Sequence, residues 1–351
     1  MIRRRKAIFN QFTQFLAIGF GIVILLGLVL ALFGLPVLHS LSLIFQGSLG
    51  NKVGIGRTCA KACPLILTGL GVTVAWRAGM FNIGGEGQYV IGGLTGAWGA
   101  KLLLERHIEG PIVLLSILLL SIVGGGFYGW LAGFLKVKRS VDVVISTILL
   151  NFIAIEFLHW AVSSPLKEAV GGIPETQQLP QSAMLWQPDP QTDLTLGIFI
   201  SIAVAILVWV FMYRTKAGFQ LRVVGDNPFA ARANKLSTQF SQVLAMTVSG
   251  GLCGLAGGIE YTAINGQIGR DFNQNWGFLG IPVAILGVLH PIYLVLAAFY
   301  FGAMLAGSFN LSSFTHLGDT LIYVVEACAV LFVVALQAYR ERKLKISEDL
   351  N

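Results

Sequence analysis

Glu86 has the greatest potential for chemistry in this chain, because it lies in a polar, glycine-rich stretch between two apolar segments. The stretch reads WRAGMFNIGGEGQ over residues 76–88, and each flanking segment is long enough to cross a bilayer. Lipid offers no hydrogen-bond partners, so irregular or charged backbone at membrane depth must be buried in protein or line a water-filled path. This pattern predicts a transport pathway around Glu86.

Other polar and aromatic side chains are candidates for the same pathway. Aromatic rings can stack on a planar solute, and amides can read its polar edge. Asn151 and Glu156, five residues apart in one apolar segment, are predicted to share a broad helix face. The alternative is internal pairing, for example of Arg77 with Glu86. The predicted pathway residues are Phe81, Asn82, Glu86, Gln88, Asn151, Glu156, Trp276 and Phe278.

The composition identifies the class of protein that must position these residues. Of 351 residues, 55% are hydrophobic and only 12% are charged, and the mean hydropathy is +0.75. These values predict an all-α polytopic membrane protein, with one transmembrane domain over residues 1–351. About ten spans of roughly 20 apolar residues are expected. They are 15–38, 54–76, 82–100, 111–135, 141–162, 196–213, 238–262, 276–289, 291–311 and 318–338.

The basic residues predict the orientation. Most of the 24 Lys and Arg residues fall on one side when both termini are placed in the cytoplasm. The net charge of +7 is then explained by loops at the membrane surface, and no nucleic acid partner is expected. The lipid bilayer is the expected surrounding. A proline-rich loop over 163–195 is predicted outside, and a tail over 339–351 is predicted inside.

The spans divide into two groups, 15–162 and 196–338, which are predicted to be inverted repeats. The second group has its own polar break, DFNQNWGFLG over 271–280, just before the eighth span. Gly84 and Gly87 would then match Gly277 and Gly280. Glycines at four-residue spacing predict close helix packing. They are Gly125, Gly129, Gly133, Gly250, Gly254 and Gly258.

A basic cytoplasmic loop is predicted over 214–237. Within it, the sequence Gly-Asp-Asn-Pro at 225–228 ends one helix and starts another. Asn227 or Asp226 is expected to cap a short helix that begins near Pro228.

The motifs of common enzyme sites are missing from the sequence. It contains no G-x-x-x-x-G-K-[ST] loop and no G-x-S-x-G elbow. Its histidines and cysteines do not have the spacing of metal ligands. We therefore expect no catalytic residue, no metal and no cofactor bound by this chain.

Four blocks carry a resemblance to a known family. They are AWRAGMFNIGGEGQ at 75–88, DVVISTILLNFIA at 142–154, GFQLRVVGDNPFAARANKL at 218–236 and GFLGIPVAILG at 277–287. Through them the chain resembles the permease subunits of bacterial ABC importers in the branched-chain amino acid and simple-sugar group, especially nucleoside-type permeases. The resemblance implies a type II-like permease in the bacterial plasma membrane.

The resemblance also implies partners. They would be a cytoplasmic ATPase subunit that uses ATP and Mg²⁺, a second permease in a homodimer or heterodimer, and an extracytoplasmic substrate-binding protein. The loop over 214–237 would couple to the ATPase through Asp226, Asn227, Pro228, Ala230, Ala231 and Arg232. An alternative function is a proton-coupled secondary carrier, with Glu86, Glu156 or Glu326 carrying the proton.

Overall fold

The fold is all-helical over the residues that the structure describes. This computed structural model describes residues 21, 23–28, 30–32, 34–168, 172–263, 266–314, 327 and 331. Nine of the 24 residues of the predicted first span, most of the tenth span, the tail over 339–351 and Glu326 lie outside them. The helices are α2 (Val37–Ser48), α3 (Lys52–Arg77), α4 (Gly85–Leu104), α5 (Pro111–Arg139), α6 (Val143–Ser163), η1 (Gln181–Ala183), α7 (Gly197–Arg214), α8 (Lys216–Asp226), α9 (Pro228–Ala233), α10 (Thr238–Ala263), α11 (Trp276–Leu286) and α12 (Pro291–Phe314).

Six of the described helices are long and apolar enough to cross a membrane. They are α3, α5, α6, α7, α10 and the first 21 residues of α12. The predicted third span falls on α4, which is interrupted by glycines, and the predicted eighth span falls on α11, which has only 11 residues. The prediction of an all-α polytopic membrane protein is therefore confirmed.

The described helices belong to two compact units, Cys59–Tyr300 and a smaller unit made from Met1–Thr58 with Phe301–Asn351. In the smaller unit, Leu26, Leu30, Leu43 and Leu311 form a hydrophobic cluster. Asn310 donates a hydrogen bond to the carbonyl of Leu43 at 2.8 Å. This unit therefore has its own core, in which α2 meets the end of α12.

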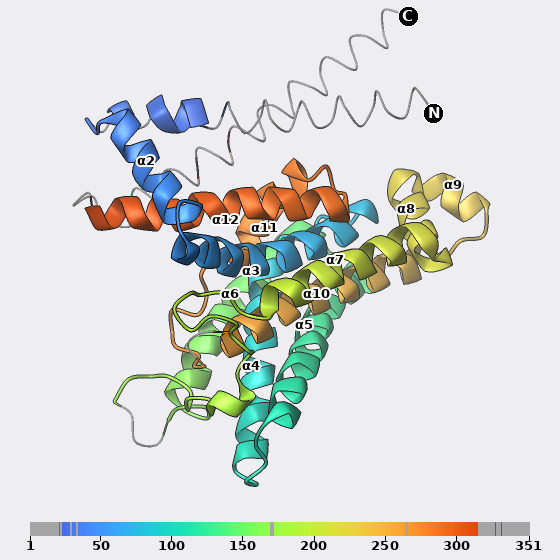
Figure 1. Ribbon diagram of the computed structural model, residues 1–351. Coiled ribbons are helices and arrows are strands. Elements are labelled where there is room, and N and C mark those ends of the chain that lie inside the picture. The colour runs from blue at the N-terminus through green and yellow to red at the C-terminus, as the bar shows by residue number, and fades with distance from the viewer. Residues whose placement is uncertain are drawn as a thin grey trace, which may run out of the picture. The chain divides into compact units, whose positions relative to one another are not determined.

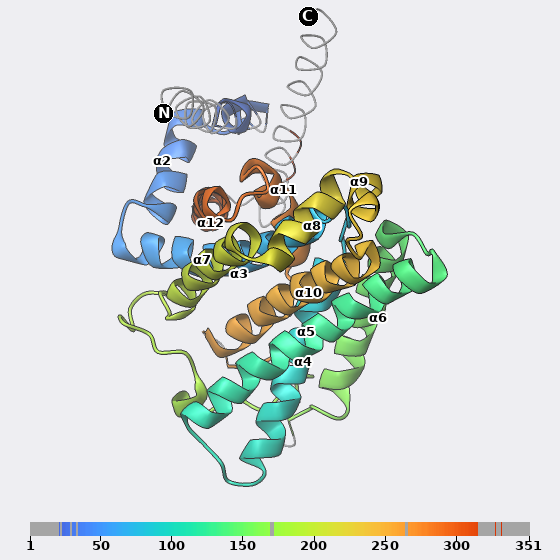
Figure 2. The same ribbon diagram turned by 90° about the vertical axis from the view of Figure 1, so that its right-hand side faces the viewer.

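The core of the larger unit is a bundle in which α4, α5 and α10 pack side by side, as both ribbon views show (Figure 1, Figure 2). The six predicted packing glycines lie where α5 and α10 approach most closely. A Cβ atom added at any of them would come within 2.2–3.0 Å of another residue. Close packing at these glycines is confirmed, and it lets two long helices bury their backbones against each other.

Two of the inter-helix connections in the larger unit are similar in form. α3 and α10 each contain 26 residues, and each is followed by a non-helical stretch and a new helix. The first stretch covers 78–84, before α4, and the second leads to α11 at Trp276. Both polar breaks predicted from the sequence are present. Broken helices of this kind are common where a transporter binds its solute.

Candidate translocation site

The first break is held by a reciprocal pair of amides. The Asn82 side chain accepts a hydrogen bond from the Gly84 amide at 2.8 Å and donates to the Gln88 side chain at 2.9 Å. Gln88 donates back to Asn82 at 3.2 Å, and Asn82 also donates to the Ser249 hydroxyl of α10 at 2.9 Å. Both amide side chains are buried. They satisfy the turn that starts α4, which lipid could not do.

A second clamp comes from α6. The Asn151 side chain accepts from the Gly87 amide at 2.8 Å and donates to the Ile83 carbonyl at 3.0 Å. The Thr147 hydroxyl accepts from the Ile83 amide at 3.3 Å. The buried Asn151 amide therefore bonds backbone on both sides of the point where the break passes into α4. α6 thereby fixes the place where α4 begins.

Glu86 joins the first break to the second. Its two carboxylate oxygens accept hydrogen bonds from the Asn275 amide at 3.0 Å and the Gly277 amide at 2.7 Å. These amides belong to the N-terminus of α11, where backbone N–H groups lack partners within the helix. A carboxylate is favourable there because the helix dipole is positive at this end. Glu86 is completely buried, so the second half-helix is capped by a side chain from the first.

The two half-helices meet through glycines. A Cβ atom added to Gly277 would come within 2.0 Å of the Glu86 amide nitrogen, and one added to Gly85 within 3.2 Å of Gly277. The hydroxyl of Thr68 donates to the Trp276 carbonyl at 3.0 Å, which ties α11 to α3 as well. The Lys61 ammonium lies 5.1 Å from the centre of the Trp276 ring. This junction therefore has no room for larger residues.

The predicted pathway residues fall into two groups. Asn82, Glu86, Gln88, Asn151 and Trp276 are buried. The four polar side chains among them hold backbone groups or one another.

The other group is exposed: Phe81 by 54% and Phe278 by 37%, and the Glu156 side chain by 80%. Phe81 lies in the first break and Phe278 in the first turn of α11, so each break has an exposed aromatic side chain beside it.

The prediction that Asn151 and Glu156 share a face is wrong, and so is the alternative that pairs Arg77 with Glu86. Asn151 and Glu156 do not share a face, since Asn151 is buried and Glu156 is exposed beside His159 at 3.8 Å. Five residues at about 100° each leave two side chains roughly 140° apart around a helix. Arg77 does not pair with Glu86. Its guanidinium donates to the carbonyls of Leu289 at 3.1 Å and Val288 at 3.2 Å.

The sequence analysis missed the hydroxyl groups that complete this junction. Thr68, Thr147 and Ser249 lie in α3, α6 and α10, and each bonds to a group at one of the breaks. In the sequence, each of them is a Ser or Thr inside a long apolar segment, and this is the only pattern that could have indicated them. That signal is weak, because Ser and Thr in helices also bond to the carbonyl one turn before them, as Thr68 and Thr147 do.

At one end of α10, α8 and α9 form the segment predicted for coupling (Figure 1). The Asn227 side chain accepts from the amides of Phe229 and Ala230, both at 3.0 Å, and Pro228 is the first residue of α9. The predicted cap and restart are therefore confirmed for Asn227, whereas Asp226 ends α8. Arg232 donates to the Pro228 carbonyl at 3.2 Å and lies over the Phe229 ring. Ala231 is buried and Ala230 is exposed.

The end of α8 packs against the end of α3. A Cβ atom added to Gly225 would come within 2.1 Å of the Arg77 carbonyl oxygen. Gly79, the second residue of the first break, has φ +73° and faces Gly225. The Arg77 side chain in turn holds the carbonyls of Val288 and Leu289 after α11. These two residues have φ of 54° and 48°, a left-handed conformation that costs roughly 1–2 kcal/mol per residue outside glycine.

His290 lies in the same turn, among aromatic and basic side chains. Its ring is 5.2 Å from the ring of Tyr213 and 4.6 Å from that of Tyr293. The Arg222 guanidinium covers the Tyr213 ring at 4.7 Å. Burial, and then the charge of Arg77, lower the pKa of His290 below its ordinary value of 6.5. A neutral His290 therefore fits this turn best.

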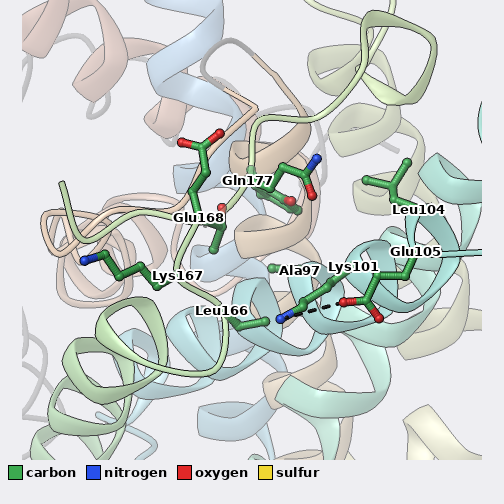
Figure 3. Close-up of a pocket in the computed structure, with 10 residues that line it drawn as sticks. Ala97, Lys101, Leu104, Glu105, Leu166, Lys167, Glu168 and Gln177 are labelled. Carbon is green, nitrogen blue, oxygen red and sulfur yellow. Dashed lines mark ion pairs between the residues drawn. The ribbon is translucent and has the colours of Figure 1, made fainter. Parts of the chain in front are cut away.

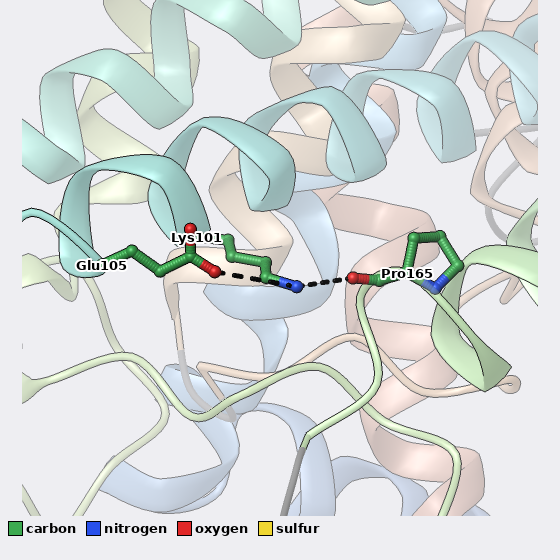
Figure 4. A network of polar contacts seen from close by, with 3 residues as sticks. All are labelled: Lys101, Glu105 and Pro165. Atoms are coloured by element: carbon green, nitrogen blue, oxygen red, sulfur yellow. Dashed lines mark hydrogen bonds and ion pairs between the residues drawn. The ribbon is translucent and has the colours of Figure 1, made fainter.

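A pocket of about 290 Å³ lies at the C-terminal end of α4, away from the end that carries Glu86 (Figure 3). It is lined by α4, by the loop that follows α6 and by Tyr261 of α10. The Lys101 ammonium donates to the Pro165 carbonyl and lies 3.8 Å from Glu105 (Figure 4). Lys167 and Glu168 add another charge of each sign to the lining. The link from Lys101 to Pro165 ties the end of α4 to the predicted outer loop.

Comparison with known proteins identifies the family. The family model of the branched-chain amino acid transport system permease component matches residues 54–333. The guanosine ABC transporter permease protein NupP of Bacillus subtilis is 32% identical, over 91% of this chain and 93% of its own length. The nucleoside ABC transporter permease protein NupB of Lactococcus lactis is 28% identical over 95% and 94%. The glucose ABC transporter permease protein TsgB13 of Haloferax volcanii is 26% identical over 92% and 87%. Most of the chain is therefore similar to these proteins, and it belongs to the permease-component family of branched-chain amino acid transport systems, as its four sequence blocks predicted.

Proposed function

We propose that this chain is the membrane-spanning permease subunit of an ATP-driven importer for nucleosides or a related sugar-containing solute. The junction of α4 and α11 carries the proposal. Two half-helices start inside the larger unit, and Glu86 locks their N-termini together. Phe81 and Phe278 are the exposed aromatic side chains beside it. Relatives named for guanosine, nucleoside and glucose transport support a solute that carries a sugar.

The proposal includes the partners that such a subunit needs. α8 and α9 form a compact basic segment suited to a groove on a cytoplasmic ATPase, which would consume ATP and Mg²⁺. The residues proposed to meet it are Asp226, Asn227, Pro228, Ala230, Ala231 and Arg232. A second permease would complete the path, and the outer loop over 163–195 would receive the substrate-binding protein. Both termini would then lie in the cytoplasm of a bacterium.

The bonding of Glu86 argues against the alternative of a proton-coupled carrier. Each oxygen of Glu86 already accepts a backbone hydrogen bond, and protonation would weaken them because a neutral carboxyl is a poorer acceptor than a carboxylate. Glu156 is exposed on the far side of its helix from Asn151, which separates it from the junction. The ATP-driven mechanism therefore accounts for the two carboxylates better.

Uptake by the assembled transporter tests the proposal. Cells without nucleoside carriers would express this chain with its ATPase, second permease and binding protein, and uptake of radiolabelled guanosine, uridine and glucose would be measured. We expect uptake of at least one solute that disappears when the ATPase is omitted. Uptake that persists without the ATPase and stops with a protonophore would instead establish the secondary carrier.

A further inference from the structure

A broad apolar groove runs between α5, α7 and α10, away from the junction. Its volume is about 840 Å³, and nearly all of its lining is apolar. Val123 and Phe127 of α5 are 64% and 60% exposed along it, although both lie within a membrane-spanning helix. The lining includes Val123, Gly126, Phe127, Trp130, Val204 and Gly251. In a bilayer, hydrocarbon is the solvent that such an exposed apolar groove would meet.

Two glycines give the groove its depth. A Cβ atom added to Gly126 would come no closer than 3.4 Å to Thr247, and one added to Gly251 no closer than 3.4 Å to Ile122. The neighbouring Gly125 and Gly250 differ, since an added Cβ there would come within 2.4 Å and 2.2 Å of backbone oxygens. Glycine in a helix costs about 0.5–1 kcal/mol relative to alanine. At Gly125 and Gly250, close helix packing explains why glycine is used despite that cost. At Gly126 and Gly251 a side chain would have room, and its absence leaves the space that forms the groove.

One end of the groove leads to a group of basic side chains. Val123, Phe127, Trp130, Phe134 and Lys138 recur at three- or four-residue spacing, so they form one stripe along α5. The rings of Phe127, Trp130 and Phe134 stack in sequence, with centroids 5.6 and 5.2 Å apart.

Lys136, Lys138 and Arg139 lie in the last turn of α5. The nearby carboxylate of Asp142 caps α6 by accepting from the Ile145 amide. The stripe thus runs from an apolar groove to a basic end.

The dimensions match a phospholipid. At 1.5 Å per residue, Trp130 lies about 12 Å along the helix from Lys138, and Val123 about 22 Å. Half of the hydrocarbon core of a bilayer is about 15 Å thick. A phosphate at Lys138 would therefore place the acyl chain of the same lipid along Trp130 and into the groove.

We propose that this groove and the basic end of α5 form one binding site for an anionic phospholipid. The phosphate lies at Lys138 with Lys136 and Arg139, and one acyl chain lies over Gly126 and Gly251 between α5, α7 and α10. The basic end favours a lipid over a neighbouring protein helix, because an apolar helix in the groove would leave those charges without a counterion. Any lipid can touch an apolar helix face, and the basic end of α5 makes this contact selective for negative charge.

Quenching of Trp130 fluorescence tests the site. The full chain in mild detergent would be titrated with phosphatidylglycerol or phosphatidylcholine carrying the same brominated acyl chains. The signal of Trp130 is the difference between the chain and its Trp130→Phe variant. We expect half-maximal quenching at an about fivefold lower concentration of phosphatidylglycerol than of phosphatidylcholine.

Three variants separate the parts of the site. Lys138→Gln is expected to bring the two titrations together, whereas Lys167→Gln, at the opposite end of α6, leaves them apart. Gly126→Leu is expected to weaken quenching by both lipids, because its side chain fills the groove. Equal titrations for the two lipids, or selectivity that survives Lys138→Gln, would overturn the proposal. Loss of quenching on co-expression with a second permease would make the groove a subunit interface instead.

Discussion

Single polar residues in this chain hold backbone in place. Glu86, Asn82 and Asn151 each bond main-chain groups at the two breaks. A charged side chain within the bilayer costs roughly 2.5–3.5 kcal/mol on insertion scales, and here the bonds to the start of α11 offset that cost. The ionisable group in the first break is therefore a structural cap.

Removal of the Glu86 carboxylate should destabilise the larger unit. Glu86→Ala leaves the buried Gly277 amide without this partner, at about 1–3 kcal/mol, and removes the acceptor of the part-buried Asn275 amide. Glu86→Gln keeps one acceptor oxygen, so we expect an intermediate loss. Thermal unfolding of the purified chain would measure the order of Tm: wild type, Glu86→Gln, Glu86→Ala. Glu156→Gln is the matched control and should leave Tm unchanged. If Glu86→Ala melts with the wild type, Glu86 is not the cap that its geometry indicates.

The two breaks could be predicted from the sequence, but the contacts between them could not. The break at 76–88 was predictable because charge and glycine interrupt an apolar chain locally. The partner of Glu86 lies 191 positions away at Gly277, and no local pattern encodes that distance. Asn151 and Glu156 illustrate a different limit. Their polarity was visible, but the prediction that they share a face ignored the rotation of the helix between them.

His290 should make stability depend on pH. Because the pKa of His290 is lowered in the folded chain, the unfolded chain binds more protons at this position below about pH 6.5. This proton uptake by the unfolded chain lowers the free energy of unfolding as the pH falls below about 6.5. Above that pH, His290 is neutral in both states and has no such effect. Asn at this position can still accept from the Ile292 amide, as His290 does at 3.3 Å.

The measurement is Tm between pH 7.5 and 5.5 for the wild type and His290→Asn. We expect the variant to lose less Tm than the wild type over this range. Parallel curves for the two proteins would show that His290 binds protons equally in the folded and the unfolded chain.

At the level of elements, α5 and α10 form the tightest seam of the bundle. The glycine spacing predicted this seam, since a regular four-residue repeat marks one helix face. The same spacing could not distinguish glycines in the seam from those beside it. Gly250 faces the carbonyl oxygen of Gly125, whereas its neighbour Gly251 faces the open groove.

Alanine at these two neighbours should have opposite effects. In Gly250→Ala the new Cβ would lie 2.2 Å from the Gly125 oxygen, so the helices must separate, and we expect a loss of about 1–3 kcal/mol. Gly251→Ala has room and should be neutral or more stable, because alanine favours the helix by about 1 kcal/mol. Thermal unfolding of both variants measures the difference. A similar Tm for both would mean that the seam can relax.

Across the whole molecule, one line of contacts joins the α8–α9 segment to both breaks. Gly225 of α8 packs on the Arg77 carbonyl and faces Gly79 of the first break, and the Arg77 side chain holds the turn after α11. Glu86 closes the line by joining α4 to α11. Because packed junctions of this kind have little freedom to deform, movement of α8 would carry both half-helices together. The α8–α9 segment was predictable from its sequence, but its contact with Arg77 arises only in the fold.

Arg77 is where this coupling can be broken. Arg77→Gln loses two charge-assisted hydrogen bonds to carbonyls in the strained turn at Val288 and Leu289. We expect ATP-driven uptake by the assembled transporter to fall about tenfold or more, while insertion and ATPase binding persist. Arg77→Lys should also be impaired, because a single ammonium cannot reproduce the fork that reaches both carbonyls. Lys216→Gln removes a charge at the other end of α8, which makes neither bond, and should transport normally. Full uptake by Arg77→Gln would mean that the α8–α9 segment reaches the half-helices by another route.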